Sequence, residues 1–435
     1  MQPPIIIIGG GISGLHLAAL ISPHAPVVIY EKTSDLGGRA QAVDFHGFQL
    51  DFGPHPIRFG ALSALGLSLT ELHSPIEFIQ PGPVQWVKPD GTIQIFPAGG
   101  IGSIFRSKFP KKWALIEFML MLKRIQPNAI KTLLDVPLQQ WMDQNTLDPA
   151  IQQYLTILSG VVMVNPDPTC VSTGELLDII QQILKKGSVY YPRGGWATLF
   201  TKFRSIIEAH GGLIHLNQKV EEIVVEQNAV KGVRIGSEFI PASGVISTIP
   251  IQNLPKLFGT SPAGMTEDLR RRCQTVRPVK GVSIDFCLTQ LVTNLNGIFM
   301  LEKPIGFGFS PSLLSPEICP PRGQILSFFA PLQFDQYADQ DQRLAFFQEF
   351  RDIIVKTFPL ISEACKYERP LFYEMVDGRD CAIDQHRKRN LGYTLPQLSR
   401  FWMTGDSTGG IGGGGEIGHT SVRECFELLK TEYGW

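Results

Sequence analysis

Three glycines near the start of the chain have a spacing suited to contact with phosphate groups. Gly9, Gly11 and Gly14 follow the pattern G-x-G-x-x-G, and Glu31 comes 22 residues after the first of them. In this pattern the first glycine permits a tight turn, the second lets the backbone approach a pyrophosphate, and the third permits close packing of a helix on a strand. An acidic residue at this distance can accept hydrogen bonds from ribose hydroxyls. The spacing therefore predicts a dinucleotide site.

The elements predicted around these residues are those that such a site requires. Residues 5–8 form an unbroken apolar run, which is typical of a strand buried on both faces of a parallel sheet. Residues 15–21 predict a helix that Pro23 helps to end, and residues 27–30 predict a second strand. The N-terminus of the helix would present unpaired N–H groups and a partial positive charge to the phosphates.

A second short motif follows Glu31. Gly37, Gly38 and Arg39 would let the chain pass close to a pyrophosphate and neutralise its charge with a guanidinium. At this point the sequence resembles the flavoprotein superfamily of phytoene desaturases, amine oxidases and protoporphyrinogen oxidases. The resemblance implies FAD as cofactor. It also implies an α/β fold in which a Rossmann-like FAD-binding domain carries an α+β substrate domain.

The end of the chain resembles the closing motif of the same superfamily. Gly405 and Asp406 follow the apolar residues 401–404, and the resemblance implies that the aspartate binds the ribityl and pyrophosphate region of FAD. A glycine-rich turn at 409–415 would reach the pyrimidine edge of the flavin, where a final helix begins. Because no cysteine lies in this turn, we expect FAD to be bound without a covalent link. The residues implied in FAD binding are Gly9, Gly11, Ser13, Gly14, Glu31, Lys32, Gly38, Arg39, Gly53, Pro54, His55, Val220, Thr248, Gly405, Asp406, Gly415, Glu416 and Ile417.

Two residues are candidates for catalysis, and each has a plainer alternative. In the superfamily, the stretch that Gly53-Pro54-His55 resembles runs beside the flavin, so His55 could face the isoalloxazine or the substrate. His55 could equally satisfy a backbone carbonyl in its own turn. Lys280 opens a predicted strand, and some amine oxidases of the superfamily carry a lysine that holds a water at flavin N5; the alternative is a surface lysine.

The motifs of the superfamily fall in three separate segments. They predict a discontinuous FAD-binding domain at 1–78, 187–260 and 390–435. The intervening segments, 79–186 and 261–389, carry no such motif and are expected to form the substrate domain. Alternating apolar residues in the second of these segments predict an antiparallel sheet with helices on one face.

Composition limits the classes of function. The 435 residues carry a formal net charge of −1, which gives no reason to expect nucleic acid as a partner. The seven cysteines lack C-x-x-C spacing, which argues for a reducing compartment and against a metal site. The first predicted strand starts at Ile5, leaving no room for a signal peptide, and no apolar run reaches the roughly 20 residues of a membrane-spanning helix. We therefore expect a cytoplasmic protein.

A basic and apolar segment, 106–134, has two interpretations. From Arg106 to Lys131 the sequence has seven Lys and Arg residues and one acidic residue, Glu117. Residues 113–122, in the middle of this segment, are mostly apolar. Such a helix could lie peripherally in a membrane interface and admit a substrate dissolved in lipid. It could also be a buried helix of the substrate domain whose lysines are solvated.

The expected function is that of an FAD-dependent oxidoreductase that takes a hydride from a small-molecule substrate onto flavin N5. Desaturation or oxidation of an apolar, polyene- or isoprenoid-like substrate is favoured by the resemblance to phytoene desaturases around Gly53–His55 and by the segment 106–134. It is also favoured by glycines at 412–415, where amine oxidases place an aromatic residue of their substrate cage. Amine oxidation with oxygen as acceptor is the alternative. A flavin-dependent isomerase, or a flavin-binding subunit without redox turnover, is an alternative of another class.

Overall fold

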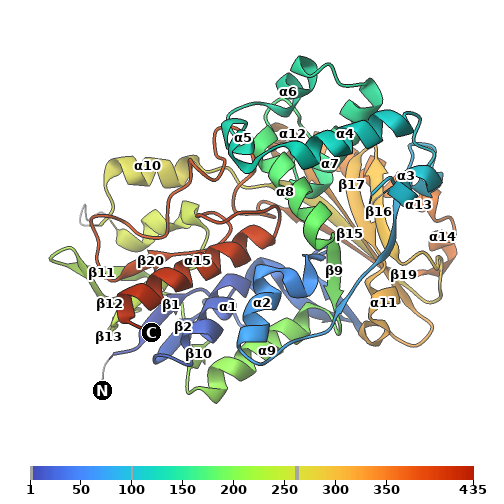
Figure 1. Cartoon of the computed structure of the whole chain (residues 1–435). Helices are drawn as coiled ribbons and strands as arrows, with labels where there is room; N and C mark the ends of the chain where they lie inside the picture. Colours follow the sequence, from blue (N-terminus) through green and yellow to red (C-terminus); the bar gives the residue numbers. More distant parts are fainter. Residues whose placement is uncertain (1–2, 99–100, 260–263) are drawn as a thin grey trace.

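The computed structural model describes residues 3–98, 101–259 and 264–435. A parallel sheet with its helices forms one half of the molecule, and a larger mixed sheet with a group of helices forms the other (Figure 1). The predicted domain limits stay predictions, and the one placed at 260/261 lies outside the described residues.

The parallel sheet has the strand order β10-β2-β1-β14-β20. Its central strand, β1 (Ile5–Ile8), pairs with β2 (Val27–Tyr30) and β14 (Gly244–Ser247). The outer strands are β10 (Leu213–His215) and β20 (Phe401–Met403). Every residue of the three inner strands is buried, as expected for a parallel sheet whose two faces are covered. The predicted Rossmann-like α/β fold is confirmed.

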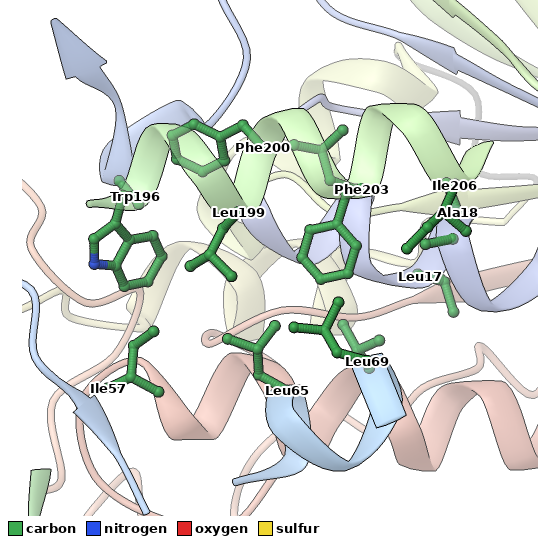
Figure 2. Packing of buried hydrophobic residues seen from close by; sticks show 14 of the residues in the cluster. Leu17, Ala18, Ile57, Leu65, Leu69, Trp196, Leu199, Phe200, Phe203 and Ile206 are labelled. Carbon is green, nitrogen blue, oxygen red and sulfur yellow. The ribbon is translucent and has the colours of Figure 1, made fainter. Parts of the chain in front are cut away.

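Apolar side chains of four helices share one core with this sheet. These helices are α1 (Ile12–Ile21), α2 (Ala64–Glu71), α9 (Trp196–Ala209) and α15 (Glu416–Tyr433). Figure 2 shows Leu199 and Phe203 of α9 directed toward Leu65 and Leu69 of α2, with Leu17 of α1 beside them. All five side chains are completely buried. Because α9 and α15 come from distant parts of the chain, the three segments of this half cannot form the core separately.

The larger sheet has the strand order β19-β15-β18-β17-β16-β7-β8. Its strands are β7 (Gly82–Val87), β8 (Ile93–Ile95), β15 (Lys280–Leu288), β16 (Gly297–Glu302), β17 (Ile305–Phe309), β18 (Gln324–Leu332) and β19 (Cys365–Tyr373). The strands of residues 261–389 pair antiparallel, as predicted, and β7, which comes from the other segment, joins β16 in a parallel pair that was not predicted. These two strands come from different excursions of the chain, so neither local pattern could reveal their pairing. Helix α13 (Gln340–Thr357) packs against the sheet through Phe350, Ile353 and Ile354.

A group of helices lies above the junction of the two halves (Figure 1). They are α3 (Ile101–Arg106), α4 (Lys112–Arg124), α5 (Pro127–Thr132), α6 (Leu138–Gln144), α7 (Pro149–Val162) and α8 (Thr173–Lys186). The hydroxyl of Ser172 accepts a hydrogen bond from the Glu175 N–H at the start of α8, and Gly187, with φ of 91°, ends the helix. Within the described ranges, no helix has both the length and the apolar character that crossing a membrane requires.

Smaller elements complete the fold. The short strands are β3 (Ala42–Phe45), β4 (Phe48–Asp51), β5 (Ile57–Arg58), β6 (Phe78–Ile79), β9 (Val189–Pro192), β11 (Glu222–Glu226), β12 (Ala229–Ile235) and β13 (Glu238–Pro241). The remaining helices are α10 (Glu267–Thr275), α11 (Pro311–Leu314), α12 (Phe334–Ala338) and α14 (Ile361–Ala364). Strand β5 pairs with β9, which fixes the backbone of Arg58 beside the helical group.

Candidate active site

A continuous cavity of about 1260 Å³ extends from the parallel sheet to the helical group. Its wall contains all the residues predicted to bind the cofactor except Gly14, Gly405 and Ile417. Small-molecule sites are usually about 300–1,000 Å³, so this cavity has room for a cofactor and a substrate together. The predicted cofactor residues, drawn from many places along the chain, therefore lie around one space.

The glycine turn after β1 leaves the start of α1 open to the cavity. Gly9 has a φ of 107°, a conformation that favours glycine. A Cβ atom on Gly14 would lie 2.0 Å from the Gly9 carbonyl oxygen, so Gly14 does not line the cavity but allows α1 to pack closely on β1. Gly11 is the N-cap of α1, and none of the described side chains caps it. A Cβ on Gly38 would lie 3.2 Å from the Gly11 Cα, so the backbones of these two glycines lie close together without side chains between them. Uncapped N–H groups at the start of a helix are suited to bind an anion.

The carboxylate of Glu31 is fixed at the end of β2. One oxygen accepts a hydrogen bond from the Gly10 N–H at 2.7 Å, and the other accepts from the Thr33 N–H at 2.9 Å and the Thr33 hydroxyl at 2.7 Å. Glu31 is 7% exposed, and its exposed part faces the cavity. A carboxylate has about four acceptor positions, so Glu31 keeps capacity for a hydroxyl of a ligand.

Arg39 and Asp406 meet on the cavity wall through two hydrogen bonds of 2.8 and 2.7 Å. Asp406 also accepts from the Gly378 N–H at 2.7 Å, and Arg39 donates to the Val376 carbonyl at 3.1 Å. Burial alone would raise the pKa of Asp406, but the Arg39 guanidinium and these hydrogen bonds hold it below its ordinary value. Asp406 is therefore an anion at neutral pH.

The glycine-rich turn is tied to its surroundings by a residue that carries no sequence motif. Arg58 of β5 donates from Nε to the Gly413 carbonyl at 2.8 Å and from Nη2 to the Val162 carbonyl at 2.6 Å. Helix α15 begins at Glu416 immediately after this turn, without a side-chain cap among the described residues. Arg58 and the N-terminus of α15 thus bring positive charge to the same part of the cavity.

Glu416 has one occupied and one unoccupied carboxyl oxygen. Oε1 accepts a hydrogen bond from the Ala64 N–H at 2.9 Å, whereas Oε2 is buried and has no partner among the described residues. Burial raises the pKa of Glu416 to about 7. The side chain therefore carries a proton for part of the time at neutral pH.

His55 makes a local hydrogen bond and also reaches the cavity. Its Nε2 lies 2.7 Å from the Phe52 carbonyl oxygen, and its ring packs 5.3 Å from that of Trp196. Burial lowers the pKa of His55 to about 4, so the ring is neutral at pH 7. A neutral ring that donates from Nε2 leaves Nδ1 as an acceptor.

Lys280 does not line the cavity. Its Nζ lies 2.7 Å from a carboxylate oxygen of Glu374 and stands over the rings of Phe334 and Tyr337 at 4.5 and 4.7 Å. These contacts account for the lysine without a substrate, so we give it no part in the proposed reaction.

The half of the cavity beneath the helices is largely apolar. Its wall is formed by Val84, Ile104, Ile116, Met119, Leu158, Val161, Val164, Ile180, Ile183, Ile298, Met300, Phe307 and Phe329, among others. Tyr373 joins this wall and shares a hydrogen bond of 2.7 Å with the Ser283 hydroxyl. Asp377 lies on the wall farther along the same segment, and burial raises its pKa to about 6. The sequence singled out neither Tyr373 nor Asp377, because neither belongs to a motif.

The cavity reaches the surface between α3, α4 and α8. Ile101, Leu120 and Leu184 each line it and are also exposed to solvent. Trp113 on α4 is 71% exposed and packs edge-on against the exposed ring of Phe105, 6.0 Å away. Helix α4 buries its other side through Leu115, Phe118 and Leu122, so one side is packed in the protein and the other is exposed, and both interpretations of this segment stay predictions. We call Ile101, Phe105, Trp113, Leu120 and Leu184 the apolar rim.

Comparison with family models identifies the class of protein that this fold and site define. Residues 7–61 match the model of an NAD(P)-binding Rossmann-like domain, and residues 123–343 match that of the flavin containing amine oxidoreductases. The chain belongs to the flavin containing amine oxidoreductase family. This membership confirms the predicted resemblance and implies a flavin cofactor.

Curated relatives include a desaturase and an oxygenase. A phytoene desaturase (lycopene-forming) of Pseudescherichia vulneris is 25% identical over 291 residues, which cover 60% of this chain and 58% of that protein. A 4,4′-diaponeurosporene oxygenase of Staphylococcus aureus is 23% identical over 287 residues, covering 58% and 56%. The chain spans about half the length of the curated relatives it matches.

Solved structures share the fold over nearly the whole chain. An oxidoreductase from Methanosarcina mazei has a TM-score of 0.82 at 18% identity, covering 98% of this chain and 100% of that chain. Cyclohexylamine oxidase from Brevibacterium oxydans has a TM-score of 0.71 at 16% identity and covers both chains completely. At these identities the likeness concerns the fold alone.

Proposed function

We propose that the cavity binds FAD without a covalent link and that the protein oxidises an apolar, polyene- or isoprenoid-like substrate by removing a hydride from carbon. The observation that carries this proposal is the continuity of the cavity between its cofactor residues and its apolar half. The relatedness to phytoene desaturases supports the same substrate class.

The residues at the sheet end fit a dinucleotide. The uncapped start of α1 suits a pyrophosphate, the free acceptor positions of Glu31 suit ribose hydroxyls, and Arg39 offers a guanidinium beside both. Asp406 would bind the ribityl hydroxyls. Bound flavin would supply an acceptor for the substrate hydride at its N5, which is chemistry that these side chains lack.

The remaining residues position the substrate and accept its proton. The apolar wall would align a hydrocarbon chain and exclude water. Desaturation also removes a proton from the carbon next to the one that loses the hydride. Asp377 faces the cavity with a pKa of about 6, so at neutral pH it is mostly a carboxylate and can accept this proton. We assign it the role of general base.

An apolar substrate must reach the cavity from a lipid phase, and the apolar rim is the proposed route. Ile101, Leu120 and Leu184 line the cavity where it reaches the surface, and Phe105 and Trp113 are exposed on α3 and α4. The exposed basic residues beside them are Arg106, Lys108, Lys111, Lys123 and Arg124. Apolar side chains flanked by positive charge suit the interface of an anionic membrane. The proposed contact is therefore peripheral, through α3 and α4.

The test is anaerobic bleaching of the bound flavin's visible absorbance. The FAD-loaded protein is mixed with a polyene precursor in liposomes, and an amine panel is run in parallel. Bleaching by the polyene, with a new conjugated double bond in the product, is expected. Bleaching by amines alone would overturn the proposed substrate class while leaving the flavin assignment intact.

Amine oxidation is the second candidate. It is favoured by membership of the family and by two aromatic side chains on the cavity wall, Tyr373 and Phe329, whose ring centres are 6.3 Å apart. Aromatic faces attract cationic groups. Reoxidation of the amine-reduced flavin by air would support this candidate.

A further inference from the structure

Within the described part of the chain, Arg58 has no salt-bridge partner for the positive charge that it presents to the cavity. Its two hydrogen bonds go to the neutral carbonyl groups of Gly413 and Val162. Among the described residues, no carboxylate oxygen lies within 4.0 Å of its guanidinium. Its Nη1 donates to none of these residues, although an arginine has five N–H donors. By contrast, Arg39 on the same wall is neutralised by Asp406.

The nearby acids offset this charge only in part. Asp377, which is mostly ionised at neutral pH, and Glu416 both act on Arg58 electrostatically, but neither carboxylate lies within 4.0 Å of the guanidinium, and burial raises the pKa of Glu416 to about 7. Glu416 is thus protonated for much of the time at neutral pH. Burial lowers the pKa of Arg58, yet an arginine keeps its proton in proteins. An incompletely paired charge in an apolar site is costly unless a ligand brings the opposite charge.

The position of Arg58 indicates which part of a ligand it meets. Gly413 belongs to the glycine-rich turn that leads directly into α15, whose N-terminus carries a partial positive charge. The bond to the Val162 carbonyl anchors the guanidinium at the end of α7, and the pairing of β5 with β9 fixes its backbone. Two sources of positive charge are therefore held rigidly at one site.

We propose that Arg58, together with the N-terminus of α15, stabilises the negative charge that the N1–C2=O edge of the flavin holds after reduction, and so raises the flavin's reduction potential. A hydride brings two electrons and one proton to N5, which leaves one negative charge on the ring system. A fixed guanidinium favours this reduced form over the neutral oxidised form. The inference rests on the proposed flavin, but it is independent of the substrate.

The experiment compares FAD-loaded wild type, Arg58→Met and Arg58→Lys, with Arg204→Met as a surface control. Sulfite adds to N5 and leaves the same negative charge on the ring, so its affinity reports the charge environment without a substrate. We expect Arg58→Met to bind sulfite about 100-fold more weakly. This change corresponds to about 60 mV in a two-electron reduction potential, which a reference dye measures independently. Arg58→Lys should lie between Arg58→Met and wild type, and Arg204→Met should match wild type.

An Arg58→Met variant that holds FAD with the wild-type sulfite affinity and potential would overturn the inference. If Arg58→Met holds no flavin, Arg58→Lys and Arg58→Gln decide instead. The lysine variant must then bind sulfite at least tenfold more tightly than the glutamine variant, and equal affinities would contradict the proposal. A wild-type chain that binds no flavin would overturn the proposed function as well, so the two failures are distinguishable.

Discussion

Arg39 and Asp406 are 367 residues apart in the sequence and form a two-point ion pair with N–O distances of 2.8 and 2.7 Å. Because Asp406 also accepts from the Gly378 N–H, the pair joins the segments after β2, β19 and β20 at the cofactor end of the cavity. An ionised Asp406 therefore contributes to the contact between the two halves of the molecule.

Removing one partner of this pair should weaken the fold. Asp406→Asn should lower the free energy of unfolding by about 1–3 kcal/mol, because the buried amide cannot replace a two-point ion pair. Partial solvent exposure of the Arg39 side chain keeps the loss below that of a fully buried pair. Urea denaturation of the flavin-free chain measures the loss. The control is Asp268→Asn in the exposed pair with Arg271, where the expected change is under about 0.5 kcal/mol; equal losses would contradict the account.

The packing of α1 on β1 depends on the missing side chain of Gly14. In Gly14→Ala the new Cβ would lie 2.0 Å from the Gly9 carbonyl oxygen, so helix and strand must separate. We expect a loss of at least about 3 kcal/mol in unfolding free energy or a failure to fold. Gly102→Ala, in helix α3 with open space around its Cβ, is the matched control and should be neutral or stabilising. Similar thermal midpoints for the two variants would show that α1 does not pack this tightly.

A buried histidine pair should make the fold sensitive to acid. His419 and His16 face each other with Nδ1 atoms 3.2 Å apart, and burial lowers the pKa of His419 to about 4. Between pH 6.5 and 4 the unfolded chain binds a proton that the folded His419 does not, so stability falls as the pH falls through this range. At pH 4 this difference in proton binding by His419 lowers the free energy of unfolding by about 3 kcal/mol.

Unfolding free energies of His419→Gln, measured across this range, should decline less steeply than those of wild type. His24→Gln, at an exposed position, should follow the wild-type slope. If removal of His419 leaves the slope unchanged, the ring is not held neutral by burial.

If the apolar rim contacts a membrane, changes to its aromatic side chains should weaken the binding of the protein to lipid vesicles. The double change Phe105→Ser and Trp113→Ser should weaken binding to anionic phospholipid vesicles by at least about tenfold, since burial of each aromatic ring in the interface is lost. Vesicle sedimentation measures the binding. Phe239→Ser removes an exposed ring from the far strand β13 and should have no effect. Retention of full vesicle binding by the double variant would place any membrane contact elsewhere.

Local spacing made the cofactor half predictable from the sequence. Gly9, Gly14 and Glu31 occupy fixed offsets between a strand and a helix, so their geometry follows from a stretch of about thirty residues. Arg58 and Asp377 reach the cavity only because distant segments of the chain fold together, and no local sequence pattern identifies either of them as a site residue.

Contacts between distant segments also explain why the structure of the substrate half differs from what the sequence predicted. The parallel pairing of β7 with β16 joins two excursions of the chain, which periodicity within either excursion does not encode. For α4, an almost continuous apolar run fitted both a buried and an interfacial helix; its neighbours bury Leu115 and leave Trp113 exposed.

The most direct test of the account is release of the cofactor from natively purified protein. We predict that acid denaturation liberates FAD at about one molecule per chain, with no flavin left on the precipitated protein, and that Glu31→Ala loses most of this FAD because the hydrogen bonds to the ribose are gone. A nicotinamide dinucleotide in its place, flavin that stays on the chain, or full FAD retention by Glu31→Ala would contradict the assignment of the cavity.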